Sequence, residues 1–205
     1  MSKTESIFVG FIIGPVLPIV LFLAGWWISL NFVTDRTVFV YGLMGLGIGF
    51  IVDFIFLKRW ISRAYMWQTK VLVAVYIFYS VGVFGFFMGV PIFNLAVGIM
   101  AGIFMGRRLY HSCTTKERLN NGVLKVSLFT ASTMGVISVA SAYFATKDLQ
   151  DTALNLRGMF KLSFLPTEQM IIALIVVGEI GLVLGQYLIT KRLTHLAYRI
   201  GSHVS

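Results

Sequence analysis

Charged residues are scarce in this chain of 205 residues. Asp, Glu, Lys and Arg together make up 12% of it, whereas hydrophobic residues make up 58%. Soluble domains usually carry about 25% charged residues, so this composition excludes an ordinary water-soluble domain. We therefore expect a multi-pass integral protein of the cell (cytoplasmic) membrane.

Cysteine and histidine are also rare. The single cysteine, Cys113, can form neither an intrachain disulfide nor a metal site with several thiolates. The three histidines, His111, His195 and His203, all lie in polar segments, which disfavours an intramembrane haem with two histidine ligands. The sequence predicts no metal site and no cofactor.

The remaining sequence is dominated by long apolar runs. They lack the alternation of barrel strands, so we predict a single transmembrane domain folded as an all-α bundle of about six transmembrane helices. The fourth run is short and either thins the bilayer locally or re-enters it from one side. The segment 145–168 is predicted as an external loop whose apolar side chains could lie in the membrane interface. The predicted spans cover residues 7–30, 37–57, 71–89, 91–106, 122–144 and 169–190.

Basic residues indicate the orientation of the spans. Most of them follow the second, fourth and sixth spans, and cytoplasmic connections are the ones that concentrate Lys and Arg. We therefore predict that both termini are cytoplasmic, and that the positive charge reflects topology and attraction to anionic lipid headgroups rather than nucleic-acid binding. The residues on this side are Lys3, Lys58, Arg59, Arg63, Lys70, Arg107, Arg108, Lys116, Arg118, Lys191, Arg192 and Arg199.

Small residues recur every four positions in two spans. The fourth span contains Asn94, Gly98, Gly102 and Gly106, and the second contains Gly45 and Gly49, followed by an aspartate at the same interval. This spacing places each set on one helix face, where another backbone can approach closely. The glycines predict tight packing within the protomer, in a homo-oligomer or against a partner membrane subunit. A groove lined by exposed carbonyls is the alternative.

Proline interrupts the first span. Pro15 and Pro18 each remove a backbone donor, so they should kink this helix and leave carbonyl groups in need of other partners.

The most informative polar residue is Glu179, which lies near the middle of the last apolar run. An acid at this depth costs about 2.5–3.5 kcal/mol, and no Lys or Arg lies near the midplane in any span. A proton, water or a cation must therefore neutralise it. We predict a small transporter or channel that moves a proton, cation or small solute through a polar midplane site. The candidate site residues are Glu179, Gln186, Asn94, Thr130, Thr133 and Ser138.

Two other functions remain open. A non-catalytic membrane subunit, or the substrate-binding component of a larger membrane complex, would use the glycine faces and Glu179 to contact its partner. A membrane-embedded enzyme has less support, because the spans contain neither paired acids nor a serine with a buried histidine.

Asp53 differs from Glu179 because it lies close to the end of its span. Lys58 and Arg59 follow about one turn later. We predict a structural ion pair between Asp53 and a basic side chain at the headgroup level.

The orientation can be tested at Cys113, which is flanked by the basic residues of one predicted cytoplasmic segment. We expect an impermeant maleimide to leave Cys113 unmodified in intact cells and to label it after permeabilisation. Efficient labelling from outside would reverse the predicted topology.

Overall fold

The computed structural model describes residues 1–33, 35–112 and 115–203, so Cys113 lies outside the described residues. Within these ranges all regular structure is helical, and six helices are long and apolar enough to cross a membrane. The six apolar helices predicted from the sequence are thus confirmed. Their insertion and topology stay predictions, as does the single domain. By its internal contacts the chain divides into two compact units, Met1–Thr69 and Lys70–Ser205.

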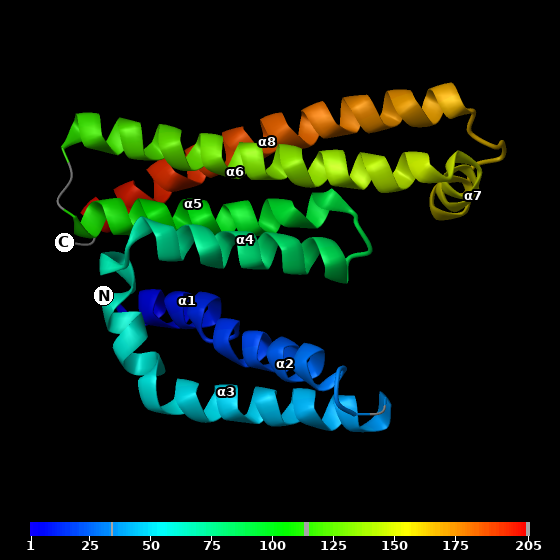
Figure 1. Cartoon of the computed structure of the whole chain (residues 1–205). Coiled ribbons are helices and arrows are strands. Elements are labelled where there is room, and N and C mark those ends of the chain that lie inside the picture. The colour runs from blue at the N-terminus through cyan, green and yellow to red at the C-terminus, as the bar shows by residue number, and fades with distance from the viewer. Residues whose placement is uncertain (34, 113–114, 204–205) are drawn as a thin grey trace. The chain divides into compact units, whose positions relative to one another are not determined.

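The first unit contains helices α1 (Lys3–Ile13), α2 (Val16–Ser29) and α3 (Asp35–Arg63) and the short 3-10 helix η1 (Ala64–Met66) (Figure 1). A capping box begins α1: the Ser2 hydroxyl accepts from the Glu5 amide, and the Glu5 carboxylate accepts from the Ser2 amide. The predicted first span is interrupted at Gly14 and Pro15, because proline cannot continue the hydrogen bonding of α1.

Helices α2 and α3 pack antiparallel at very short range. A Cβ atom on Gly45 would overlap the carbonyl of Leu21, and a Cβ on Gly49 would overlap the backbone of Pro18. Because glycine carries no side chain, the two backbones can approach this closely. The contact covers the same α3 face that contains Asp53, four residues after Gly49.

The second unit contains α4 (Thr69–Phe86), η2 (Pro91–Phe93), α5 (Asn94–His111), α6 (Lys116–Lys147), α7 (Leu149–Phe160) and α8 (Glu168–His203) (Figure 1). A tight turn ends α4. Its left-handed residues are Met88 and Gly89, with φ of 54° and 82°, and the Gly89 amide donates to the Phe84 carbonyl at 2.8 Å.

The fourth span is longer than predicted. The prediction ended it at residue 106, before Arg107 and Arg108, but the helix continues through both arginines to His111. Counted from Pro91, the candidate span has 21 residues. At ~1.5 Å per residue this corresponds to about 31 Å, close to the thickness of a hydrocarbon core, but this length includes both arginines. Local thinning and a re-entrant path therefore both stay predictions.

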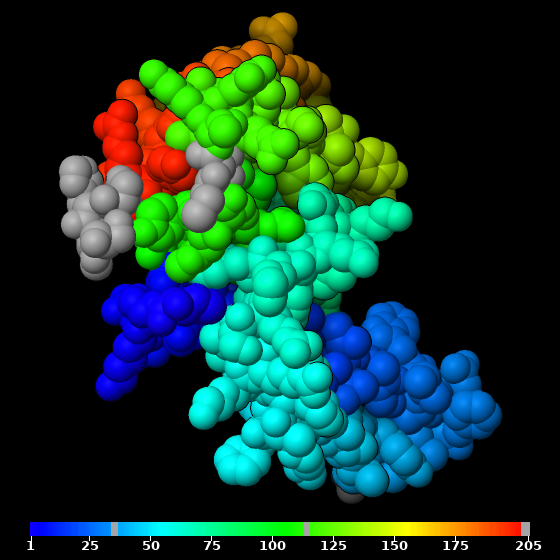
Figure 2. Space-filling view, turned by 90° about the vertical axis from the view of Figure 1, so that its left-hand side faces the viewer, coloured from blue at the N-terminus to red at the C-terminus, as the bar shows by residue number. Residues whose placement is uncertain are grey.

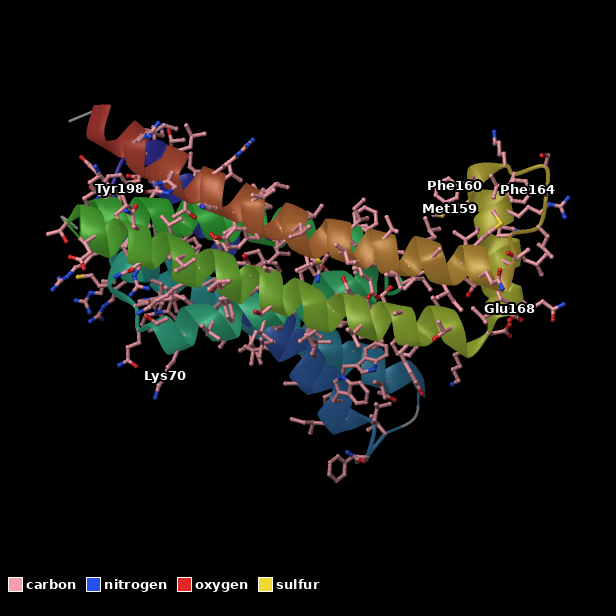
Figure 3. All side chains as sticks on the ribbon, turned by 90° about the horizontal axis from the view of Figure 1, so that it is seen from above. Lys70, Met159, Phe160, Phe164, Glu168 and Tyr198 are labelled. Atoms are coloured by element: carbon pink, nitrogen blue, oxygen red, sulfur yellow. The ribbon has the colours of Figure 1, made fainter. Side chains whose placement is uncertain are left out.

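Helices α6 and α8 lie side by side and antiparallel along most of their length (Figure 3). Thr130 of α6 contacts Thr190 of α8, and Gly135 lies opposite Val183. Helix α8 has 36 residues and extends well beyond the predicted end of the span at residue 190. The apolar run ends at Lys191, but lysine and arginine favour helix, so the helix itself does not end there.

The predicted external loop contains a helix. Asp148 caps α7 by accepting from the Asp151 amide at 2.9 Å, and Lys161 ends it in a left-handed conformation. Figure 3 shows α7 running across the ends of α6 and α8, with Met159 and Phe160 on it. Both side chains are exposed. A crosswise helix with exposed apolar residues is compatible with the predicted position in the membrane interface.

The glycine face of α5 lies against α8. A Cβ atom on Gly102 would come within 3.1 Å of the Thr190 carbonyl oxygen, and one on Gly106 would overlap the Thr194 carbonyl. By contrast, a Cβ on Gly181 would meet no atom within 4 Å.

We expect Gly106→Ala to destabilise the protein by about 1–3 kcal/mol, because the added methyl group would push α5 away from a backbone atom of α8. Gly181→Ala is the matched control and should leave the thermal unfolding temperature in detergent unchanged or slightly raised. Equal melting temperatures for the parent and Gly106→Ala would show that this helix contact is loose.

Candidate functional site

Three helices of the second unit meet at Thr190 of α8. The Gln186 side-chain amide donates to the Thr190 hydroxyl at 2.9 Å, and the Thr130 hydroxyl of α6 lies 3.1 Å from it. The Thr190 hydroxyl in turn lies 3.4 Å from the carbonyl oxygen of Gly98 on α5. Gln186, Thr190 and Thr130 are all fully buried. This junction joins α5, α6 and α8 through polar atoms in an otherwise apolar interior.

The junction is compatible with two hydrogen-bond arrangements. A hydroxyl carries one hydrogen, yet Thr130 has two acceptors within reach, the Ser127 carbonyl at 3.1 Å and the Thr190 hydroxyl. In one arrangement Thr130 donates to Thr190, which donates to the Gly98 carbonyl. In the other, Thr190 donates to Thr130, which donates to Ser127. Reversal needs only rotation of two hydroxyl hydrogens.

A row of buried polar side chains follows the contact between α6 and α8 in both directions from Thr190. The distance along α8 from Glu179 to Thr194 is about 22 Å at ~1.5 Å per residue. We call this the polar row. It consists of Ser127, Thr130 and Ser138 on α6 and Glu179, Gln186, Thr190 and Thr194 on α8.

Several oxygen atoms of the polar row have no hydrogen-bond partner among the described residues. They are Oε1 of Glu179, Oε1 of Gln186 and the hydroxyl oxygens of Ser127 and Ser138. A buried polar atom without a partner typically costs about 1–3 kcal/mol. The carboxyl and amide oxygens are acceptors, and the two hydroxyls can donate or accept. A water molecule would satisfy any of them, and a proton or a cation would satisfy the acceptors.

Glu179 and Ser138 lie at neighbouring levels of the α6–α8 contact. The helices are antiparallel, and Gly135 lies opposite Val183. Ser138 follows Gly135 by three residues, and Glu179 precedes Val183 by four, so the two residues are about one turn further along the same contact. Ser138 is 1% exposed, and Glu179 is half-buried with one buried carboxyl oxygen. Each of these two residues has a buried oxygen without a hydrogen-bond partner among the described residues.

Apolar side chains separate this level from the Thr190 junction. Met134, between Thr130 and Ser138 on the buried face of α6, is 1% exposed. Val183 lies between Gln186 and Glu179 on α8 and contacts the α6 backbone at Gly135. The polar row is thus divided into two polar clusters with an apolar layer between them.

The other predicted site residues lie elsewhere. The Asn94 side chain is buried and donates to the Ser80 carbonyl of α4 at 3.0 Å, while its own oxygen has no partner among the described residues. Thr133 donates to the Phe129 carbonyl of its own helix at 3.0 Å. No hydrogen bond between described residues joins Glu179 to Asn94 or to Thr133. The predicted set is therefore spread over several levels instead of forming one cluster.

Asp53 of the first unit faces the break between α1 and α2. Gly49, four residues earlier on the same face, contacts Pro18, and Leu57, four residues later, contacts Gly14. Asp53 is 6% exposed, and its Oδ1 has no hydrogen-bond partner among the described residues. Because Pro18 has no N–H, the Gly14 carbonyl opposite also lacks its usual helical donor. The ion pair of Asp53 with a basic side chain stays a prediction.

The sequence analysis did not include Thr190 or Thr194 among the site residues. Both lie at the end of the last apolar run or beyond it, away from the midplane where the site was predicted. The available signal was spacing: Gln186, Thr190 and Thr194 follow one another every four residues, which places them on one helix face. Thr194 donates to the Thr190 carbonyl at 2.7 Å.

The described residues contain no group of three or more His, Cys, Asp or Glu side chains that could hold a metal ion. No protein-family model, curated protein or solved structure matches this chain. The described residues form an all-helical fold with six helices long and apolar enough to cross a membrane, which is compatible with a multi-pass membrane protein. Its polar row is the best candidate for a functional site.

Thr190→Val removes the hydroxyl at the three-helix junction and keeps the shape of the side chain. We expect it to destabilise the protein by about 1–2 kcal/mol, because the Gln186 amide and the Gly98 carbonyl both lose a partner. Thr133→Val is the matched control, since among the described residues Thr133 bonds to the Phe129 carbonyl of its own helix, and it should change stability much less. Thermal or denaturant unfolding in detergent measures both. Equal effects would argue against a structural role of the junction.

Proposed function

We propose that this protein is a small transporter or channel of the cell membrane that moves a proton, a cation or a small solute. Both termini are cytoplasmic in this proposal, and the glycine faces hold the helices together. The central site is the level of Glu179 and Ser138, and the Thr190 junction lies between this level and the cytoplasm.

The observation that carries the proposal is the pair of unpartnered buried oxygens on Glu179 and Ser138. A protein that needed only a packed helix contact would be more stable with apolar residues at both positions. An acid beside a hydroxyl suits a transported proton or cation, because both groups can accept a hydrogen bond or coordinate a positive charge. The Thr130 and Thr190 hydroxyls of the junction can reverse the direction in which they donate their hydrogen bonds.

In this proposal the apolar layer of Met134 and Val183 closes the path between the Glu179 level and the Thr190 junction. Transport requires a path past this layer, and methionine suits such a position because its unbranched side chain changes rotamer easily. Movement of Met134 would connect the Glu179 level with the junction and with Thr194 towards the cytoplasm. Glutamine and threonine side chains line this part of the path and carry no fixed charge.

A second candidate function is that of a non-catalytic subunit or substrate-binding component in a larger membrane complex. One observation favours it: Cβ atoms on Gly178, Gly181 and Gly185 of α8 would meet nothing within 4 Å. The neighbouring Val177 and Ile180 are 69% and 56% exposed. A face of small residues suits close contact with another membrane helix, from a second copy or a different protein.

Glu179→Gln tests the transport function. This variant keeps the size and hydrogen-bonding capacity of the side chain, so we expect normal folding but loss of most of the flux through purified protein in liposomes. Glu168→Gln is the matched control, because Glu168 is an exposed acid at the start of the same helix (Figure 3). It should retain the parent's flux. Pyranine inside the vesicles reports proton flux, and ion-selective dyes report Na⁺ or K⁺.

Glu179→Leu gives the opposing result if the acid has no function. Full flux together with a higher melting temperature would remove Glu179 from the mechanism, because only its burial cost would have disappeared. A parent protein that shows no flux for any probe but co-purifies in fixed ratio with another membrane protein would favour the subunit function.

A further inference from the structure

The C-terminal part of α3 and the turn that follows it form a pocket in the first unit. Its volume is about 650 Å³. The α3 residues that line it recur at intervals that keep them on one helix face. Helix η1 then folds the chain back over this face, and the Trp67 amide donates to the Ala64 carbonyl at 3.2 Å. The lining consists of Val52, Phe56, Arg59, Trp60, Arg63, Met66 and Trp67.

One part of the pocket is apolar and aromatic. The rings of Phe56 and Trp60 are stacked, with centroids 6.0 Å apart and an interplanar angle of 18°. Met66 is 76% exposed. In water such a surface would be costly, whereas acyl chains would cover it without loss.

The other part of the pocket carries two positive charges. Arg59 and Arg63 lie one helical turn apart, so both guanidinium groups belong to the same face. No acidic residue is among those that line the pocket. Two guanidinium groups at this spacing suit a phosphate, to which each can donate two hydrogen bonds.

The two parts follow each other along the helix axis. From Val52 to Arg63 the helix rises about 16 Å, which is close to half of the ~30 Å hydrocarbon core. The pocket therefore changes from apolar to basic over about the depth of one leaflet. In Figure 2 the C-terminal part of α3, in cyan, lies at the surface of the face shown.

We propose that this pocket binds one anionic phospholipid. Its phosphate lies between Arg59 and Arg63, its glycerol region lies against Trp60, and an acyl chain follows Phe56 and Val52. A free anion would leave the apolar wall uncovered, and a zwitterionic lipid such as phosphatidylcholine would bring its own quaternary ammonium group close to the two arginines. The site depends on insertion of α3 into a membrane, and it is independent of transport through Glu179.

Lipid binding can be measured on the purified full chain in detergent. The probes are dioleoyl-phosphatidylglycerol, dioleoyl-phosphatidylcholine and inorganic phosphate, each titrated at the same concentrations. We expect native mass spectrometry to show one retained phosphatidylglycerol per chain, and phosphatidylglycerol to raise the melting temperature more than the other two probes. Equal retention of both lipids would overturn the proposal, and so would an equal effect of inorganic phosphate.

The double variant Arg59→Gln/Arg63→Gln should bind phosphatidylglycerol roughly tenfold or more weakly, because each arginine near anionic headgroups contributes measurably to binding. Lys58→Gln/Lys70→Gln is the matched control, since it removes the same charge from two exposed residues that do not line the pocket. It should retain the parent's affinity. Equal weakening by both variants would mean that only net charge attracts the lipid.

A second measurement leaves Arg59 and Arg63 unchanged. Phosphatidylglycerol with brominated acyl chains quenches tryptophan fluorescence on contact. In the background Trp26→Phe/Trp27→Phe, the remaining tryptophans are Trp60 and Trp67, both of which line the pocket. We expect stronger quenching by brominated phosphatidylglycerol than by brominated phosphatidylcholine. Identical quenching curves would contradict a selective site.

Discussion

Every buried polar atom needs a hydrogen-bond partner, and this requirement constrains the packing of the helices in the second unit most strongly. Water is absent from a hydrocarbon core, so a side chain such as Thr190 must find its hydrogen bonds on neighbouring helices. It finds them only because α5 presents glycine at residue 98, which allows the Gln186 side chain to lie directly on the α5 backbone. The same close approach continues at Gly102 and Gly106. The position of α8, and with it the depth of Glu179, depends on this contact.

The two units contain the same kind of unsatisfied group in different surroundings. Glu179 lies in the first half of the long helix α8, and one of its carboxyl oxygens is buried without a hydrogen-bond partner among the described residues. Asp53 faces a place where proline has already removed backbone donors, so both sides of that contact are acceptors. In each case the protein keeps an acid where an apolar residue would pack at lower cost. Asp53 therefore marks a second position at which a positively charged group would be stabilised.

Much of the fold was predictable from the sequence, because apolar runs and prolines act locally. The six apolar helices follow from hydropathy, and the interruption of the first follows from Pro15. Helix ends were less predictable: Lys191 ends the apolar run, yet α8 continues to His203.

Glu179 and Gln186 could be identified because polar residues are rare in such runs. Their partners could not, since the register of α8 against Gly98 and Thr130 arises from packing between distant segments. Asn94 shares a stripe with Gly98 but bonds to α4, which no spacing rule indicates.

Because α8 is long, a small tilt of the helix moves its distant residues appreciably. Its 36 residues correspond to about 54 Å, so it is far longer than the ~30 Å hydrocarbon core. The Thr190 junction holds it near the middle, and Glu179 lies about 16 Å from that pivot. A tilt of about 5° would displace the carboxyl group by roughly 1.4 Å, enough to make or break a hydrogen bond. The part of α8 that follows the junction, up to His203, lies on the other side of this pivot, so a movement of that part would also change the surroundings of Glu179.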